Sequence, residues 1–121
     1  NASDMSTKAN ADIHVLGDAS QQGDMPKSGF SANSQAKVCA NAVRGSLTGS
    51  KVFPAKFSNT CWSLVHENDG IKVGATYKAT AEKIAKVDGF ISATNESAEL
   101  RKATYEESEG WYAGITADMF G

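Results

Sequence analysis

The stretch TCWSLVHENDGIKVGATYKA, residues 60–79, decides the fold class of this chain. Its first part, TCWSLVH, is rich in residues that favour strands, and ENDG at 67–70 is a turn signal that Gly70 closes. In residues 71–79 apolar side chains alternate with polar or small ones; the apolar members are Ile71, Val73, Ala75 and Tyr77. We therefore expect an antiparallel hairpin with one face buried.

The residues after this hairpin predict a further strand and closing helices. EKIAKVDGFIS at 82–92 is typical of a short strand or strand pair, broken at Asp88-Gly89. From residue 95 onward, Asn95 or Ser97 can cap a helix with acids in its first turn, and Gly110 is a candidate bend. Strands followed by helices indicate an α+β unit, a small antiparallel sheet packed with helices.

Before the hairpin, the chain reads IHVLGDASQQGDMPKSGFSANSQAKV over residues 13–38. The β-branched run at 12–16 predicts a short buried strand, and the glycines and proline of 17–30 predict a loop. Apolar residues at helical spacing then predict a helix from Ser31 to about Leu47, with Ser28 or Ser31 as its cap and Gly49 as its end.

Composition excludes several classes of protein. The chain has 121 residues, enough for one domain, and a net charge of −2 without the clustered basic residues of a nucleic-acid-binding protein. No apolar run is long enough to span a membrane. Two cysteines, Cys39 and Cys61, do not make a disulfide scaffold, and no metal-binding motif is present, so no metal site is predicted.

The first residues, NASDMSTKANAD, lack the apolar segment of a signal peptide. Residues 1–11 are small and polar without periodicity, so we expect them to be disordered or to include the remnant of a tag at Asn1-Ala2. The absence of an initiator methionine favours an excised piece of a longer protein.

A strand that ends in Gly-Asp before a helix N-terminus suits a ligand with hydroxyls and a carbonyl. Asp18 offers a fixed acceptor for a sugar-like hydroxyl, and Gly17 lets the backbone approach the ligand closely. The helix N-terminus carries unpaired N–H groups and a partial positive charge, beside which Lys27 adds a full one. The alternative is that Asp18 only caps a turn or helix.

These residues carry a resemblance to a known family. IHVLGDAS resembles the second flavin fingerprint of the pyridine nucleotide–disulfide reductase superfamily. MPKSGFSANSQAKV, FSNTCWSLV and the terminal GWYAGITADMFG resemble the C-terminal part of the flavoprotein subunit of flavocytochrome c sulfide dehydrogenase. The resemblance covers residues 13–121, and residues 79–105 match it only loosely.

The resemblance implies an oxidoreductase that oxidises sulfide with FAD and passes electrons to a c-type cytochrome subunit, in the periplasm. The family's N-terminal G-x-G-x-x-G unit is absent from this sequence. We therefore expect residues 1–50 to be the last strand and helix of an FAD-binding domain and residues 51–121 to be the family's α+β domain, which covers the flavin. Alone, the fragment is expected neither to hold FAD nor to be an active enzyme.

The same resemblance assigns the site residues. Gly17, Asp18 and Ala19 would meet the ribityl chain, and Lys27, Ser28 and Gly29 the pyrimidine end of the flavin ring. The helix N-terminus beside that end would stabilise negative charge on the ring and raise its reduction potential. The remaining cofactor contacts implied are Thr60 and the aromatic side chain of Phe30.

Two residues are implied to take part in the redox chemistry. Cys61 would be half of a redox-active disulfide whose partner lies outside this chain; sulfide would attack it, and the released thiolate would reduce the flavin. Trp111 would lie near the flavin or on the electron route. For Trp111, as for Phe30, plain core packing is an equal alternative, and Cys39 is predicted to be core packing.

Two other functions stay open. The chain could be a non-enzymatic domain that docks a redox partner, or part of a related flavin enzyme of the sulfide:quinone type. If the FAD domain is missing, residues 12–16 would be an orphan strand, either disordered or paired within a homodimer. The electron acceptor and the physiological sulfur substrate are not encoded in any motif.

Overall fold

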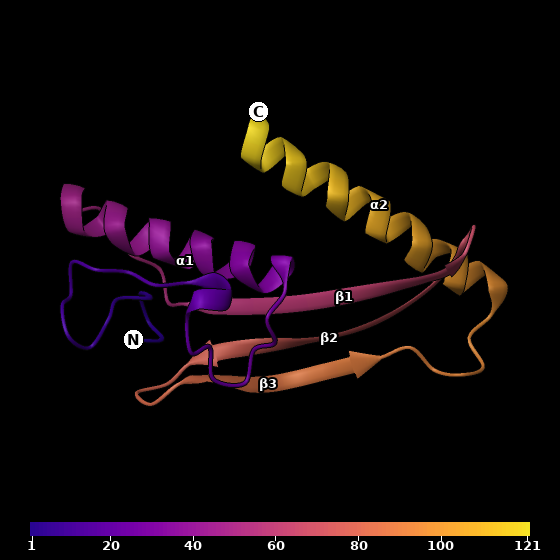
Figure 1. The fold of residues 1–121 in the computed structure, drawn as a ribbon, viewed down its shortest axis with the longest axis horizontal. Helices are drawn as coiled ribbons and strands as arrows, with labels where there is room; N and C mark the ends of the chain where they lie inside the picture. Colours follow the sequence, from indigo (N-terminus) through magenta and orange to yellow (C-terminus); the bar gives the residue numbers. More distant parts are fainter. The chain divides into compact units, whose positions relative to one another are not determined.

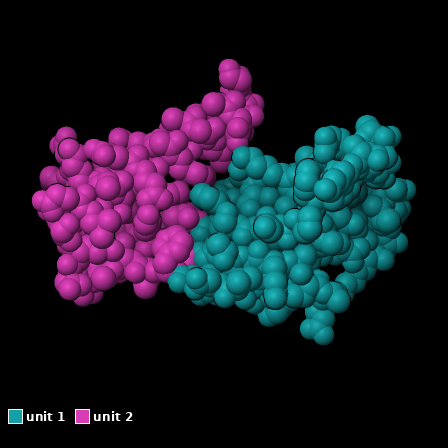
Figure 2. All heavy atoms as spheres, turned by 180° about the vertical axis from the view of Figure 1, so that it is seen from behind, with its two compact units in different colours: residues 1–59, 75–89 teal, residues 60–74, 90–121 magenta.

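The computed structural model describes residues 1–121, which form two compact units (Figure 2). Unit 1 comprises residues 1–59 and 75–89, and unit 2 comprises residues 60–74 and 90–121. One three-stranded antiparallel sheet, in the order β1-β2-β3, contributes strand segments to both units. Together with two long helices, this sheet confirms the α+β class.

Figure 1 shows the elements in chain order. A short 3₁₀ turn, η1 (Gly17–Ala19), precedes the first helix. The strands and helices are α1 (Gly29–Thr48), β1 (Lys56–His66), β2 (Asp69–Ala79), β3 (Ile84–Ile91) and α2 (Ala98–Phe120). No helix is long and apolar enough to cross a membrane.

The predicted hairpin is confirmed, but its buried face is shorter than the alternation suggests. The turn between β1 and β2 contains Asn68 at φ 59°, a left-handed conformation that asparagine tolerates. Ala75 and Tyr77 are buried as predicted, whereas Val73 is 48% exposed. The buried face ends there because Val73 belongs to unit 2, which has no large apolar core.

Helix α1 begins two residues before the predicted start. Ser28 is its cap, and the Ser28 hydroxyl accepts a hydrogen bond from the Ser31 N–H at 3.1 Å. At the other end, Gly49 adopts φ 68° and its N–H donates to the Gly45 carbonyl, so the predicted stop is confirmed.

Of the one or two closing helices expected, the structure has one, α2, which runs uninterrupted through Gly110. Ser97 is its cap, accepting from the Leu100 N–H at 3.2 Å. A Cβ at Gly110 would meet no other atom within 4 Å, so no packing contact forces the helix to bend there.

The strand predicted at residues 12–16 was wrong, whereas a tag remnant at Asn1-Ala2 stays a prediction. Residues 12–16 form no full strand but a single antiparallel bridge between Ser6 and His14, so the segment pairs within its own chain. Residues 1–11 are ordered, because Met5 enters the core at 6% exposure and Asp4 accepts hydrogen bonds from the Ser6 N–H and hydroxyl at 2.8 Å. One apolar anchor and local polar bonds outweigh the low hydrophobicity of the segment.

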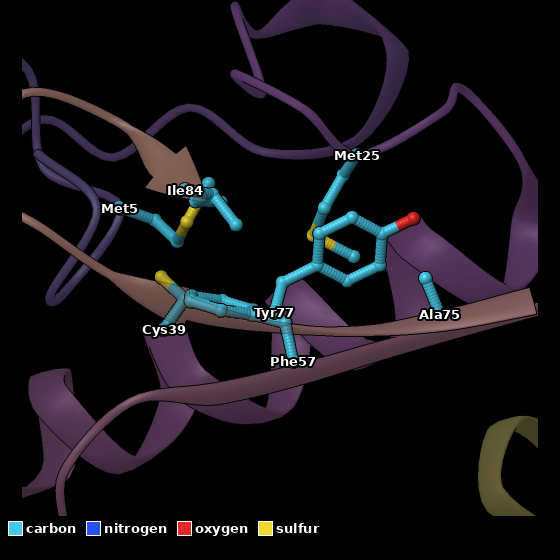
Figure 3. Packing of buried hydrophobic residues seen from close by; sticks show 7 residues of the cluster. All are labelled: Met5, Met25, Cys39, Phe57, Ala75, Tyr77 and Ile84. Carbon is cyan, nitrogen blue, oxygen red and sulfur yellow. The ribbon is translucent and has the colours of Figure 1, made fainter. Parts of the chain in front are cut away.

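The hydrophobic core lies entirely in unit 1 (Figure 3). Its members come from the N-terminal segment, the loop before α1, α1 itself and all three strands: Met5, Met25, Cys39, Phe57, Ala75, Tyr77 and Ile84. In unit 2 the buried residues are only Gly70, Gly74 and Thr104.

Unit 2 instead exposes large apolar side chains. They come from the strand segments and from α2: Leu64, Val65, Val73, Phe90, Ile91, Leu100, Tyr112, Met119 and Phe120. Helix α2 is attached to β2 by two ion pairs, Arg101 with Asp69 and Lys72 with Glu107. Polar attachment and uncovered apolar surface thus characterise this unit.

Candidate functional site

The turn η1 is fixed by hydrogen bonds to both backbone groups of Gly17. Gly17 is buried at φ 67°, where glycine is favoured, and its N–H donates to Gln35 Oε1 at 2.8 Å. The Gly17 carbonyl accepts from Gln22 Nε2 at 2.6 Å and from the Ser20 N–H at 3.0 Å. The turn is therefore held at a defined place beside α1.

Asp18, the next residue, points a carboxylate to solvent. This carboxylate makes no hydrogen bond or ion pair within the chain, and it caps neither η1 nor α1, whose cap is Ser28. The capping alternative for Asp18 is thus wrong. Lys27 reaches back over the turn, and its Nζ donates to the Asp18 carbonyl at 2.5 Å.

The N-terminus of α1 is fixed to β1 by a buried amide. Asn59 Oδ1 accepts from the Ser28 hydroxyl at 2.5 Å and from the Ser31 hydroxyl at 3.1 Å. Asn59 is 3% exposed and Ser31 is fully buried. Because the Ser28 proton is already donated to Asn59, Ser28 can offer a ligand only a lone pair or a backbone group.

The site residues predicted between Gly17 and Phe30 therefore come together in unit 1. The bond from Lys27 to Asp18 and the cap at Ser28 bring η1 next to the start of α1. Ala19, Lys27 and Gly29 are exposed, while Ser28 and Phe30 are partly exposed. An acceptor carboxylate, a lysine and the N-terminus of a 20-residue helix share this small region.

A cavity of about 380 Å³ adjoins the same turn at Ala19 and Ser20. It is lined by Ala19 and Ser20 together with residues of the N-terminal segment and of 81–84, but by neither Asp18 nor Lys27. The side chains that the sequence predicts to bind a ligand thus lie outside this cavity.

The remaining predicted residues, Thr60, Cys61 and Trp111, belong to unit 2. Trp111 packs against Trp62, with ring centroids 5.5 Å apart and an interplanar angle of 33°. Cys61 is partly exposed and forms no disulfide within the chain. All three lie on elements of the structure, β1 and α2, and their roles toward a cofactor stay predictions.

The other cysteine, Cys39, is different in kind. It is 8% exposed and belongs to the core of unit 1, as predicted. Burial, with a smaller contribution from Asp4, raises the pKa of the Cys39 thiol. A thiol that is buried and hard to ionise is a poor nucleophile.

Sequence reasoning did not assign three buried amides to the site: Gln22, Gln35 and Asn59. Gln35 is fully buried, and Gln22 is 4% exposed. A signal was present in the predicted helix, where Ser31, Gln35 and Cys39 occur every fourth residue and form one buried stripe. A polar stripe on the buried side of a helix indicates specific hydrogen bonding rather than plain packing.

The loop before α1 is anchored by charge at the start of β3. Asp24 accepts from Lys83 Nζ at 2.6 Å and from the Lys86 N–H at 3.1 Å, and these bonds lower the pKa of the Asp24 carboxyl. Gly23, at φ 66°, lies so close to this strand that a Cβ would stand 2.5 Å from the Ile84 carbonyl oxygen. The loop that follows η1 is thus bonded to η1 through Gln22 and to the start of β3 through Asp24.

Comparison with known families relates the second half of the chain to a flavoprotein family. A family described as flavocytochrome c sulphide dehydrogenase, flavin-binding, matches residues 54–120. The matched stretch contains the three strands and α2, and with them Thr60, Cys61 and Trp111. It covers more than half of the chain, and η1 and α1 precede it.

Proposed function

Since the chain belongs to the flavocytochrome c sulphide dehydrogenase family, as a flavin-binding domain, we propose that it is the C-terminal part of an FAD-dependent flavoprotein that oxidises sulfide and passes electrons to a c-type cytochrome. The match over residues 54–120 is the observation that carries this proposal. FAD is the cofactor of the family and supplies a two-electron acceptor when bound.

The residues around η1 fit the polar groups of FAD. The Asp18 carboxylate is exposed and without an internal partner, on a turn whose preceding peptide is fixed, so it can accept from a ribityl hydroxyl. Lys27 and the N-terminus of α1 supply positive charge beside it. A preorganised positive end stabilises negative charge on a ring carbonyl and so favours the reduced cofactor.

We propose that Cys61 belongs to the disulfide that sulfide attacks. In the proposal it forms a disulfide with a cysteine elsewhere in the flavoprotein, and HS⁻ attacks that bond. One S–S bond forms in the resulting persulfide, the original S–S bond breaks, and the other sulfur leaves as a thiolate with the electron pair. The partial exposure of Cys61 supports access, and the burial and raised pKa of Cys39 argue against an equal role for it.

The uncovered apolar side chains of unit 2 support contact with another protein surface. Nine large apolar side chains of this unit are exposed, and exposed apolar surface is a feature of protein interfaces. We propose that the rest of the flavoprotein and the cytochrome cover part of this surface, with the complex in the periplasm. A quinone in place of the cytochrome is the alternative acceptor.

The test is an anaerobic sulfide titration of the complete flavoprotein, followed by its visible spectrum. We expect a flavin spectrum that bleaches with sulfide, and loss of bleaching in Cys61→Ser but not in the matched variant Cys39→Ser. A flavin spectrum that sulfide does not change would refute the substrate. Bleaching that survives in Cys61→Ser would refute the role of Cys61, and absence of flavin would leave a docking domain.

A further inference from the structure

Gly17, Gln22 and Gln35 in unit 1 are joined by a closed ring of hydrogen bonds at η1, through both backbone groups of Gly17 and the two side-chain amides. The Gly17 N–H donates to Gln35 Oε1 at 2.8 Å, Gln35 Nε2 donates to Gln22 Oε1 at 2.7 Å, and Gln22 Nε2 donates to the Gly17 carbonyl at 2.6 Å. Within the ring each residue donates one hydrogen bond and accepts one, and Gln35 Nε2 also donates to Met25 Sδ at 3.6 Å. Both backbone groups of Gly17 are therefore paired with side chains that also bind each other.

The ring needs a side chain at position 35 that both accepts and donates, and the Gln35 amide does so through Oε1 and Nε2. A carboxylate at position 35 could accept from Gly17 but, when ionised, could not donate to Gln22; a lysine could donate but not accept. Gln35 is fully buried, so water cannot replace a missing partner. A fully buried glutamine is costly unless each polar atom is paired, and here Gln35 Oε1 and Nε2 both are.

The ring acts on the turn that carries Asp18. Gly17 precedes Asp18 directly, so fixing the Gly17 peptide fixes the start of the segment from which the carboxylate projects. Lys27 holds the Asp18 carbonyl on the far side, at 2.5 Å. The carboxylate itself has no internal bond, so its position depends on the backbone that these groups hold.

We propose that Gln35 is a positioning residue of the flavin site, which acts with Gln22 through the Gly17 peptide to present the Asp18 carboxylate to the ribityl chain. This inference rests on the proposed function, because it needs FAD as the ligand. Gln35 does not touch the cofactor in this proposal. Its contribution is to remove the freedom that η1 would otherwise lose on binding.

The test compares three variants of the complete flavoprotein: Gln35→Met, Gln22→Met and Cys39→Ala. Methionine keeps the length of glutamine without its hydrogen bonds. Cys39→Ala is the matched control, because Cys39 lies one helical turn along the same buried stripe and makes no bond to η1. Two readouts are measured on the apoprotein: amide hydrogen exchange of the peptide covering residues 13–24, and the FAD dissociation constant.

We expect Gln35→Met to speed exchange at Gly17 and to weaken FAD binding by roughly ten-fold or more, the scale of one hydrogen bond to a charged group. The effect of Gln22→Met should be smaller, since the Gly17 carbonyl keeps bonds from the Ser20 N–H at 3.0 Å and hydroxyl at 2.9 Å. Cys39→Ala should change neither readout beyond its loss of stability.

The outcomes separate the inference from the function on which it rests. If wild-type apoprotein binds FAD but Gln35→Met binds it as tightly as Cys39→Ala does, the positioning role is wrong and the proposed function stands. If wild-type apoprotein does not bind FAD, the proposed function fails and the inference with it. If Gln35→Met does not fold, the Gln22→Met variant is the deciding test. An FAD affinity of Gln22→Met equal to that of Cys39→Ala would then overturn the positioning role of the hydrogen-bonded ring.

Discussion

Gly70→Ala should displace helix α2 from the sheet. A Cβ at Gly70 would lie 2.9 Å from the Tyr105 nitrogen, 3.1 Å from the Tyr105 Cα and 3.3 Å from the Thr104 carbonyl carbon. All three are backbone atoms of α2, so no side-chain rotation can relieve the contact. The helix must move away from β2, which strains the ion pair between Asp69 and Arg101 beside it.

The cost can be bounded from this geometry. Forcing one extra carbon into a closely packed contact destabilises proteins by roughly 1–3 kcal/mol. The matched control is Gly114→Ala in the same helix, where a Cβ meets nothing within 4 Å. There, alanine should stabilise the helix by about 0.5–1 kcal/mol, because glycine is the poorer helix former. The two glycine-to-alanine changes thus have opposite expected signs.

Tryptophan fluorescence during urea unfolding is the assay. The chain has two tryptophans, Trp62 and Trp111, and both lie in unit 2, where their rings contact each other. Their signal therefore reports the unit that Gly70→Ala perturbs. With an m-value of roughly 1–3 kcal/mol per molar urea, the Gly70→Ala midpoint should fall by about 1 M. A Gly70→Ala midpoint equal to or above that of wild type would refute the close approach of α2 to β2.

Three further predictions concern unit 1 and the cysteines. Ser28→Ala should lower the free energy of unfolding by about 1–2 kcal/mol in urea followed by circular dichroism, since it removes the cap of α1; unchanged stability would contradict the cap. The Lys83 bond lowers the pKa of Asp24 below its ordinary 3.8, so its stabilisation should be present above that pH and be lost as pH falls through the lower, folded value. Asp24→Asn should therefore flatten the acid limb of the stability–pH curve, and an unchanged limb would argue against the pair. A thiol reagent should label one cysteine rapidly in the native chain, and this fast phase should vanish in Cys61→Ser but persist in Cys39→Ser, because Cys39 is buried with a raised pKa.

The features that the sequence predicted well depend on a few neighbouring residues. The cap of α1 at Ser28 needs only a hydroxyl three residues before the N–H that it accepts from. The stop at Gly49 likewise requires a left-handed residue at one position. Such signals are local, so they can be recognised without knowing what packs against them. In the turn between β1 and β2, by contrast, the left-handed residue is Asn68 and not the predicted Gly70, which lies inside β2.

The features that the sequence did not predict depend on distant partners. Met5 is a lone apolar residue in a polar segment, and its burial requires the core formed by Cys39 and Ile84, far along the chain (Figure 3). Gln35 pairs with Gly17, 18 residues away, and nothing in the helix periodicity indicates that partner. The alternation at 71–79 fixed which side chains share a face, but not how far the core extends along it.

Unit 1 buries several polar side chains, and unit 2 exposes many large apolar ones. Unit 1 buries glutamine, asparagine and serine side chains, which cost free energy unless each is hydrogen-bonded, and their bonds converge on η1 and on the start of α1. Unit 2 exposes nine large apolar side chains and buries only Gly70, Gly74 and Thr104. A polar interior that holds one turn is what a cofactor site needs, and an apolar exterior is what a protein interface needs. Both features therefore fit a flavin-binding part of a larger flavoprotein better than an independent docking domain, since a docking domain accounts for the exposed surface but not for the buried amides.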